Sequence, residues 1–358
     1  MKVIAFTGGG TGGHIYPGLA VAAELKKNLP NVRIIWIGSS VGIDCSIVEA
    51  AGIEFFGVPS GKLRRYFSLR TVVDFFKVLA GFFAAKKILK KQKAALLFSK
   101  GGFVSVPPCA AAASLKIPVY THESDYSPGL ATKLNARFVL RTGGKIFTAY
   151  EDTARFFAPA LRNLVITTGQ PVRADFRSAD AAKGDNTRTL LVLGGSQGAQ
   201  EVNNLVIAAL PQLTEHYTVV HQTGPGRQWD IKETEKYKPY PYIKDELPYI
   251  MKKAEIVMGR SGAGIWEWAV CGKPMILIPL TGSGTRGDQV ENARYFEKAG
   301  AAIVLEGDNA NPQSLAAAVN ELANNTQKRN AMADASSKIG KIDASAAIAR
   351  ILEEKINV

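Results

Sequence analysis

The stretch Phe6-Thr-Gly-Gly-Gly-Thr-Gly-Gly-His-Ile-Tyr-Pro-Gly18 decides the fold, because it joins a buried strand to a helix through a glycine-rich loop. Residues 3–6 are apolar and predict the strand, and residues 19–29 carry apolar side chains at helical spacing. A strand, a glycine-rich turn and a helix N-terminus together form an anion site, since backbone N–H groups and the helix dipole face the ligand. The stretch therefore predicts an α/β unit that binds phosphate.

The same pattern starts again in the second half of the chain. Residues 189–193 predict a strand, Gly194-Gly-Ser-Gln-Gly198 a glycine loop, and residues 199–210 a helix. Further short apolar runs predict strands at residues 33–38, 96–99, 118–121, 217–221, 255–258 and 274–279. Because these runs lack polar alternation, they indicate parallel sheets covered by helices on both faces.

This duplication predicts the fold class and the domains. We expect an α/β protein with two Rossmann-like domains facing a cleft, an N-terminal domain at residues 1–168 and a C-terminal domain at residues 169–340. The boundary falls where glycine and proline interrupt the pattern, in Thr168-Gly-Gln-Pro-Val-Arg173. The remaining residues 341–358 carry a helix, expected at 344–355, that is free to pack back on the N-terminal domain.

Length and composition limit the classes of protein. The 358 residues suit two domains, and 46% apolar residues indicate a folded globular chain. The net charge of +13 indicates an acidic partner, but no basic-and-aromatic RNA motif or zinc pattern accompanies it, so we expect no nucleic acid. The three scattered cysteines Cys45, Cys109 and Cys271 favour a reduced cytosolic setting. We expect neither a signal peptide nor a transmembrane helix, because no apolar run is long enough.

The first glycine loop argues against two classes of nucleotide enzyme. Gly8-x-Gly10-x-x-Gly13 matches the dinucleotide fingerprint, which also needs an acidic residue after the second strand, yet that strand ends in Trp36-Ile-Gly-Ser-Ser40. A nicotinamide or flavin cofactor is therefore disfavoured, and we expect no cofactor. The absence of G-x-x-x-x-G-K-[ST] disfavours a P-loop nucleotidase. A tight turn without a ligand stays an alternative for the glycines.

Seven short motifs run nearly from end to end of the chain: Gly8-Gly-Gly-Thr-Gly-Gly-His14, Gly101-Gly-Phe-Val-Ser-Val-Pro107, His122-Glu-Ser-Asp125, Gly169-Gln-Pro-Val-Arg173, Gly194-Gly-Ser-Gln-Gly-Ala199, Arg260-Ser-Gly-Ala263 through Glu267, and Asp288-Gln-Val-Glu-Asn-Ala293. In order and spacing they resemble the lipid-carrier N-acetylglucosaminyltransferases of peptidoglycan synthesis, a family with the GT-B fold. The resemblance implies an inverting transfer of GlcNAc from UDP-GlcNAc to the C4 hydroxyl of MurNAc. The acceptor would be undecaprenyl-diphospho-MurNAc-pentapeptide (lipid I), and the product lipid II.

The resemblance also assigns residues to the two substrates. Glu267 would bind the ribose diol, Ile243 the uracil edge and Gln289 the sugar hydroxyls. The full donor set is Thr11, Gly12, Gly13, Arg173, Ser196, Ile243, Ala263, Gly264, Ile265, Glu267 and Gln289. The acceptor and its phosphates would meet Gly101, Gly102, Phe103 and Asp125. Because no Asp-x-Asp pair occurs, we expect no obligatory metal, and backbone amides would stabilise the leaving UDP.

Two residues are candidates for the general base that the acceptor hydroxyl needs. A histidine side chain titrates near neutral pH and is a natural base, so His14 is the first candidate and Asp125 the second. The alternative that His14 only positions the loop or an acceptor phosphate stays open. We expect His122 to order its own loop. The family commonly has His-Glu-Gln-Asn in place of His122-Glu-Ser-Asp125 and Tyr in place of Phe103, so both departures lie on the acceptor side.

A basic and apolar segment predicts a membrane face. Residues 62–93 carry ten Lys or Arg and one acidic residue, Asp74. Apolar residues fall there on one helical face, which comprises Val72, Phe75, Phe76, Leu79, Phe82 and Phe83. Of these, Phe75, Phe76, Leu79 and Phe82 are the predicted membrane face. It would bind an anionic membrane surface and hold the protein peripherally at the cytoplasmic side of the cell membrane. A helix that packs on the core and exposes only lysines is the alternative.

Three other functions stay open at this point. The chain would also suit another GT-B glycosyltransferase with a different lipid or glycoside acceptor. A UDP-GlcNAc 2-epimerase shares the fold but should lack the basic apolar face. A non-catalytic protein that binds UDP-sugars or lipids would keep the glycine loops without turnover, against which the presence of both His14 and Glu267 argues.

Overall fold

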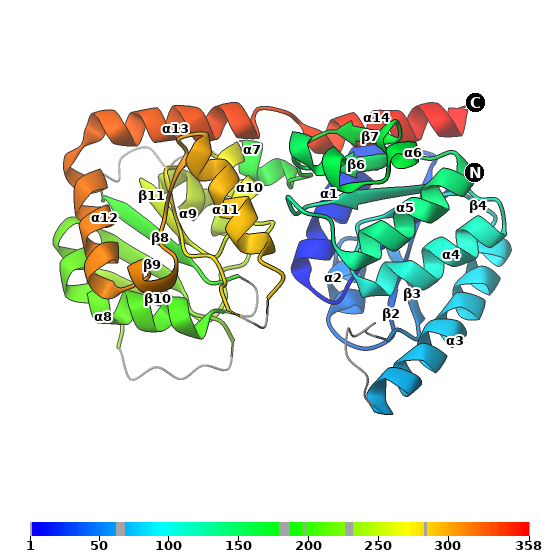
Figure 1. Cartoon of the computed structure of the whole chain (residues 1–358), viewed down its shortest axis with the longest axis horizontal. Coiled ribbons are helices and arrows are strands. Elements are labelled where there is room, and N and C mark those ends of the chain that lie inside the picture. Colours follow the sequence, from blue (N-terminus) through cyan, green and yellow to red (C-terminus); the bar gives the residue numbers. More distant parts are fainter. Residues whose placement is uncertain are drawn as a thin grey trace. The chain divides into compact units, whose positions relative to one another are not determined.

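The chain forms two compact units, one made of Met1–Arg173 with Asp343–Val358 and the other of Ala174–Ile342 (Figure 1). The computed structural model describes residues 2–61, 69–178, 187–195, 198–225, 232–282 and 285–357. Residues 169–173, which the sequence assigned to the second domain, lie in the first unit, where the Ser345 hydroxyl donates to Val172 O at 3.1 Å.

The first unit contains a parallel sheet whose described strands follow the order β3-β2-β1-β4-β5-β6-β7. These strands are β1 (Val3–Thr7), β2 (Arg33–Ser39), β3 (Glu54–Val58), β4 (Ala94–Ser99), β5 (Val119–Glu123), β6 (Ile146–Thr148) and β7 (Val165–Thr167). The register pairs Phe6 with Trp36 on one side and with Phe98 on the other. Because β1 and β4 are neighbours, the loops that follow them lie side by side at the carboxyl edge of the sheet.

Helices cover both faces of this sheet, as the apolar strands predicted. The described helices of the first unit are η1 (Gly12–His14), α1 (Tyr16–Asn28), α2 (Asp44–Ala50), α3 (Leu69–Gln92), η2 (Phe103–Ser105), α4 (Val106–Ser114), α5 (Leu130–Thr142), η3 (Glu151–Phe156), α6 (Pro159–Arg162) and α14 (Ala344–Asn357). On one face Phe6 and Trp36 pack with α1, α2 and α14; on the other, Ile35 and Leu97 pack with α3, α4 and α5.

The helix α14 completes the first of these cores, although it follows the whole second unit in the chain. Its buried residues Ile348, Ala349 and Leu352 join the cluster that contains Phe6 and Trp36. The side chain of Lys2 also donates to Ile356 O, so the described N-terminal residues and α14 are bonded together. The helix expected at residues 344–355 therefore forms part of the first unit.

The second unit repeats the architecture with the strand order β10-β9-β8-β11-β12-β13. Its described strands are β8 (Thr189–Leu193), β9 (Thr218–Gln222), β10 (Tyr237–Tyr240), β11 (Ile256–Gly259), β12 (Met275–Leu277) and β13 (Ala302–Val304). Its helices are α7 (Ala174–Ser178), α8 (Gln200–His216), α9 (Leu247–Lys253), α10 (Ile265–Val270), α11 (Asp288–Lys298), η4 (Gly307–Asn309), α12 (Pro312–Asn324) and α13 (Thr326–Gly340). The helix expected at residues 199–210 extends to His216. Pro211 lies inside it, on the exposed side, and the helix continues past this residue.

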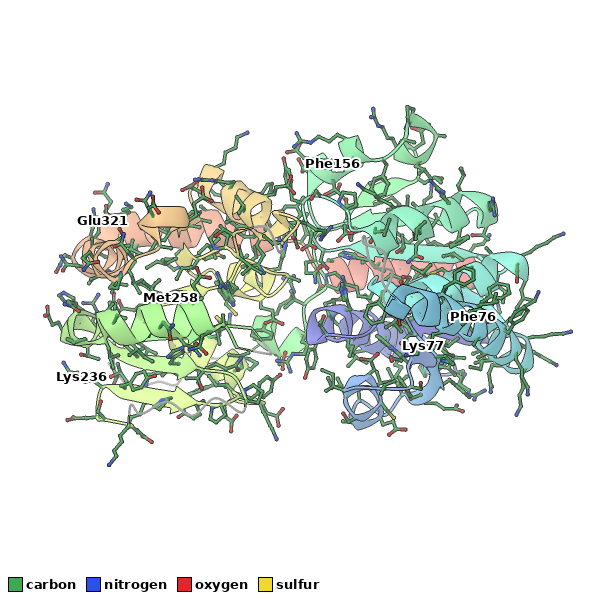
Figure 2. The ribbon with its side chains drawn as sticks, turned by 60° about the horizontal axis from the view of Figure 1, so that its bottom comes forward. Phe76, Lys77, Phe156, Lys236, Met258 and Glu321 are labelled. Carbon is green, nitrogen blue, oxygen red and sulfur yellow. The ribbon has the colours of Figure 1, made fainter. Side chains whose placement is uncertain are left out.

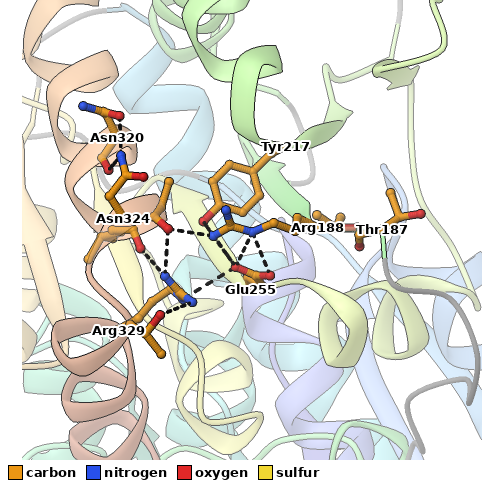
Figure 3. Close-up of polar contacts among 11 residues, drawn as sticks. Thr187, Arg188, Tyr217, Glu255, Asn320, Asn324 and Arg329 are labelled. Atoms are coloured by element: carbon orange, nitrogen blue, oxygen red, sulfur yellow. Dashed lines mark hydrogen bonds and ion pairs between the residues drawn. The ribbon is translucent and has the colours of Figure 1, made fainter.

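At the amino edge of the second sheet, an ion-pair network joins the starts of strands to two helices (Figure 3). Arg188 precedes β8, and its Nε donates to both carboxylate oxygens of Glu255, which precedes β11, at 3.1 and 3.2 Å. Arg188 Nη2 donates to the Tyr217 hydroxyl at 2.9 Å and to Ala323 O at 3.0 Å. Arg329 Nε lies 3.5 Å from the same carboxylate. The network therefore fixes α12 and α13 against this edge.

A lysine completes the same edge. Lys273 precedes β12, and its Nζ donates to Lys252 O and Ala254 O at 2.7 Å each, the carbonyls at the end of α9. Burial lowers the pKa of Lys273 to about 8. Because its partners are main-chain carbonyls, this ammonium caps the C-terminus of α9.

Candidate active site

The first glycine loop is fixed by a carboxylate that the sequence did not single out. Asp44, at the start of α2, is buried and accepts hydrogen bonds from Gly10 N at 2.9 Å and Ser39 N at 3.1 Å. A Cβ at Gly9 would lie 1.9 Å from Asp44 Oδ2, so any other residue at this position would have to displace the carboxylate. Asp44 thus holds the loops after β1 and β2 in one conformation.

The second glycine loop lies directly against the first, as the neighbouring strands require. Gly102 has φ +75°, and a Cβ there would lie 3.0 Å from Cδ2 of His14. A Cβ at Gly10 would lie 3.0 Å from the ring of Phe103. The structure therefore brings His14, Gly101, Gly102 and Phe103 together at the carboxyl edge of the first sheet.

Asp125 lies in a turn that a buried glutamate holds. The Glu123 carboxylate accepts from Ser124 N at 2.8 Å, Asp125 N at 3.0 Å and Gly129 N at 3.0 Å. The three bonds fix the turn between β5 and α5.

Lys100 is a buried cation that the sequence analysis missed. It follows β4 directly, is only 1% exposed, and its Nζ donates to the Ser124 hydroxyl. Burial lowers its pKa to about 8, although the charges of Glu123 and Asp125 oppose this effect. The signal in the sequence was a lysine between an apolar strand and two glycines, Phe98-Ser-Lys-Gly-Gly102.

His122 is buried beside this lysine. Its Nε2 lies 2.9 Å from Gly169 O, and because a carbonyl only accepts, this nitrogen carries the proton. Burial, and then the positive charge of Lys100, hold the pKa of His122 well below its usual value, against the hydrogen bond to Gly169. The ring is therefore neutral, and it bonds the segment at 168–173 beyond its own loop.

Arg173 lies near the first loop in the first unit. Its guanidinium carbon is 5.5 Å from the centroid of the Tyr16 ring, at the start of α1. Of the loop residues expected to meet the donor, Thr11 and Gly13 are exposed and Gly12 is buried. These groups are near the carboxyl edge, where an anion would meet backbone N–H groups.

In the second unit, Ile243 is buried and its backbone is already partly used. Its N–H donates to Gln222 Oε1 at 2.9 Å, and Gln222 Nε2 donates to Gly195 O at 3.1 Å. While this bond stands, Ile243 offers a base only its carbonyl. Ser196, also expected at the donor, lies outside the described residues.

The loop after β11 is fixed to α11 by two residues. Ser261 Oγ donates to Gln289 O at 2.7 Å, and Asn292 Nδ2 donates to Ser261 O at 3.0 Å. Gln289 Oε1 accepts from Leu280 N at 2.9 Å, so its amide nitrogen is the group expected to reach a sugar hydroxyl.

The expected donor turn at residues 263–267 starts α10. Ala263 is partly buried, Gly264 is exposed, and Ile265 is fully buried, so it offers a ligand only main-chain atoms. Glu267 is partly exposed in the first turn of α10. Within the described ranges, no group of three or more His, Cys, Asp or Glu side chains is arranged to hold a metal ion.

The helix α3 carries an exposed aromatic stripe. Phe75 is 60%, Phe76 62% and Phe83 60% exposed, and Leu79 is 44% exposed. Phe76 and its neighbour Lys77 are labelled in Figure 2. Phe82, expected on this face, is partly buried and packs against the core cluster that contains Ala85 and Leu89, so less of its ring is open to solvent than in Phe75, Phe76 and Phe83.

The aromatic stripe of α3 is therefore Phe75, Phe76, Leu79 and Phe83. The described basic side chains of α3 and its end are Lys77, Lys86, Lys87, Lys90, Lys91 and Lys93. No helix among the described residues is both long and apolar enough to cross a membrane.

Comparisons with known proteins agree with this geometry. The glycosyltransferase family 28 N-terminal domain matches residues 4–144, and the glycosyltransferase family 28 C-terminal domain matches residues 189–348. A protein of Treponema denticola is 48% identical over 340 residues, covering 87% of this chain and 86% of that protein. It is named UDP-N-acetylglucosamine--N-acetylmuramyl-(pentapeptide) pyrophosphoryl-undecaprenol N-acetylglucosamine transferase.

Solved structures share the fold. Acinetobacter baumannii MurG has a TM-score of 0.74 at 23% identity and covers 99% of this chain and 100% of its own. UDP-GlcNAc 2-epimerase from Neisseria meningitidis, bound to UDP-GlcNAc, has a TM-score of 0.68 at 15% identity and covers 99% and 100%. At these identities the likeness shows the fold alone, and it confirms the predicted pair of Rossmann-like domains.

Proposed function

The chain belongs to glycosyltransferase family 28 and is an N-acetylglucosamine transferase, and from this we propose that it moves GlcNAc from UDP-GlcNAc to the C4 hydroxyl of MurNAc in lipid I. The product would be lipid II, used in peptidoglycan synthesis. One observation carries the proposal: the 48% identity to the named transferase of Treponema denticola extends over 87% of the chain. The fold alone would suit an epimerase equally.

In the proposed reaction the acceptor hydroxyl attacks C1 of the sugar in line, with inversion, while UDP leaves. His14 is proposed as the general base that takes the hydroxyl proton, with Asp125 as the second choice. The support for His14 is its place at the carboxyl edge, against Gly102 and beside the loop that carries Phe103. His122 is a poor base, since its buried Nε2 is bonded to Gly169 O.

The donor would bind mainly in the second unit. We assign Glu267 to the ribose diol, the Ile243 carbonyl to the uracil and the Gln289 amide nitrogen to a sugar hydroxyl. Backbone N–H groups of the glycine loops and the turn at residues 263–265 would stabilise the diphosphate without an obligatory metal. Arg173 would add a positive charge for the same phosphates.

Release of UDP from UDP-GlcNAc tests the proposal. It would be measured with and without a lipid I analogue, in EDTA, and with UDP-glucose in parallel. We expect UDP release to depend on the acceptor, to be faster with UDP-GlcNAc than with UDP-glucose, and to continue in EDTA. Binding of UDP-GlcNAc without release in the presence of the acceptor would overturn the proposed acceptor and point to a different one, near Phe103 and Asp125.

We further propose that the aromatic stripe of α3 binds the membrane that holds the acceptor. An exposed phenylalanine row flanked by lysines suits an anionic lipid surface, because the rings enter the headgroup boundary while the ammonium groups meet the phosphates. The protein would thus act peripherally at the cytoplasmic face of the membrane. The exposures of Phe75, Phe76 and Phe83 support this use of the helix.

Liposome co-sedimentation tests the membrane proposal. The triple variant Phe75→Ser, Phe76→Ser, Phe83→Ser should bind vesicles of anionic phospholipid at least about tenfold more weakly. It removes most of the apolar area that would enter the headgroup boundary. Ile342→Ser in the second unit, 57% exposed, is the control and should bind like the wild type. Unchanged binding by a folded triple variant would contradict the proposal.

A further inference from the structure

Lys100 joins the two loops of the candidate acceptor site. Its N–H donates to Thr7 O at 2.8 Å, which fixes its backbone to the end of β1. A Cβ at Gly8 would lie 3.2 Å from Lys100 Cβ, so the lysine stem packs directly under the first glycine loop. From there the side chain runs to the turn after β5 and donates to the Ser124 hydroxyl.

The turn that Lys100 reaches carries Asp125. The Glu123 carboxylate already accepts three main-chain N–H groups of this turn, which fixes its backbone. Lys100 acts on the same turn through a side chain, and both Glu123 and Asp125 contribute negative charge around the ammonium. A buried ammonium is costly unless such groups compensate it. The ammonium of Lys100 therefore links the backbone after β4 to the turn that carries Asp125, with two carboxylates around it.

We propose that Lys100 is a positioning residue for the acceptor: through Ser124 and the charges of Glu123 and Asp125 it fixes the Asp125 turn against the His14 loop, so that the acceptor sugar is held for attack. This inference rests on the proposed function. It assigns Lys100 no proton transfer and no direct contact with substrate. Its loss should disturb the acceptor more than the donor, because the assigned donor groups are mainly in the second unit.

Lys273 provides a matched control. Burial lowers the pKa of both lysines to about 8, and both ammonium groups donate to oxygen atoms of the protein, although Lys273 is only partly buried. The partners of Lys273, however, are the carbonyls of Lys252 and Ala254 at the amino edge of the second sheet. Lys273→Met therefore removes a partly buried ammonium of similar pKa at a place where the proposal gives it no part in the reaction.

The experiment compares Lys100→Met and Lys273→Met with the full-length wild type, using steady-state kinetics with a lipid I analogue and UDP-GlcNAc. Lys100→Met should lower kcat/KM for the acceptor by about 10- to 100-fold, since small misplacements cost this much, while the KM for UDP-GlcNAc stays within about twofold. Lys273→Met should leave both within about twofold and lower the melting temperature. Lys100→Arg, which keeps charge and donors, should recover part of the loss.

The pH profile adds a readout that a merely structural role would not move. As pH rises through about 8, Lys100 loses its proton, so its hold on the Asp125 turn weakens and kcat/KM for the acceptor should fall. The groups that face the ammonium are Glu123 and Asp125, with His122 neutral beside it. This alkaline limb should be absent in Lys100→Met and present in Lys273→Met.

The outcomes separate this inference from the proposed function. A wild type without acceptor-dependent UDP release would overturn the proposed function. An active wild type together with wild-type acceptor kinetics in Lys100→Met would overturn only the role of Lys100. A loss of donor affinity in Lys100→Met, or equal losses in both methionine variants, would overturn it as well. If Lys100→Met does not fold, Lys100→Arg provides the test through its KM for the acceptor and its pH profile. The inference predicts that the alkaline fall of kcat/KM shifts to higher pH in this variant, and an unshifted fall would overturn it.

Discussion

The carboxyl edge of the first sheet and the amino edge of the second sheet both hold polar side chains that are at least partly buried, but they satisfy them in different ways. At the amino edge, Arg188 is bonded to Glu255, Tyr217 and a carbonyl, so the charges are neutralised within one network. At the carboxyl edge, His122 Nδ1 and Gln170 Oε1 are buried and have no hydrogen-bond partner among the described residues.

The difference between the two edges indicates how a polar group with a structural role can be distinguished from one with a functional role. Lys100 is buried, and Arg188 and Lys273 are partly buried, so the degree of burial alone does not assign a cation to structure or to function. The edge of the sheet does, because ligands of open parallel sheets bind beyond the carboxyl ends of the strands. Groups left without partners at that edge can then serve a substrate, whereas a closed network at the opposite edge serves stability.

The largest expected effect is at the carboxyl edge. His14→Ala should lower kcat by about 10²- to 10⁴-fold, because a general base contributes this much. Affinity for UDP-GlcNAc, measured by calorimetry, should stay within about twofold. His216→Ala, in the second unit, removes a histidine that meets Asn320 and serves as the control. A His14 variant that keeps most of its turnover would leave Asp125 as the base.

Acid should break a closed network in the interior of the second unit. His221 Nδ1 lies 3.1 Å from the Tyr237 hydroxyl and Nε2 3.1 Å from Asn203 Oδ1, and burial lowers the pKa of His221 to about 4. The unfolded chain binds the proton near pH 6.5, so the stability that the neutral ring supplies is full above that pH and is lost as pH falls to 4.

Urea denaturation of wild type and His221→Gln measures this loss. The variant should be less stable at pH 7, and the gap should shrink by about 3 kcal/mol towards pH 4, since each pKa unit is worth about 1.4 kcal/mol. His122, whose pKa is lowered as well, contributes equally to both proteins, so it cancels in the difference between their free energies of unfolding. A gap that is constant with pH would contradict the assignment.

A smaller effect is expected at the amino edge. Burial acts to raise the pKa of Glu255, but the hydrogen bonds and charge of Arg188, together with Arg329 and Tyr217, outweigh it and hold this pKa below its usual value. Glu255→Gln should lower the free energy of unfolding by about 1.5 kcal/mol at pH 7, since it weakens charged hydrogen bonds. Because the pKa is lowered, this contribution is present above about pH 4.5 and lost as pH falls below it.

Kinetics of the Glu255→Gln variant sharpen the comparison between the two edges. The KM for UDP-GlcNAc and the kcat should both stay within about twofold of the wild type, since no assigned substrate group touches this network. Melting temperatures at pH 7 and pH 4 provide the matching stability measurement. A variant of unchanged stability but impaired turnover would mean that the amino edge takes part in function.

The sequence was sufficient for the architecture and for the loops of the site. Short apolar runs and two strand–glycine loop–helix units specify parallel sheets, because these signals are local. The roles of Asp44 and Lys100 were not visible, since each depends on groups brought close only by folding. Periodicity likewise placed Phe82 and Phe83 on one side of a helix, whereas the packing of α3 on the sheet turned Phe82 inward.

The position of α14 has a consequence for biosynthesis. A ribosome makes β1, α1 and their neighbours first, then the whole of the second unit, and only afterwards Ile348, Ala349 and Leu352, which close the core around Phe6 and Trp36. During that interval the apolar surface of α1 that α14 later covers stays exposed. The second unit, whose chain is continuous, is therefore able to finish folding before α14 completes the core of the first.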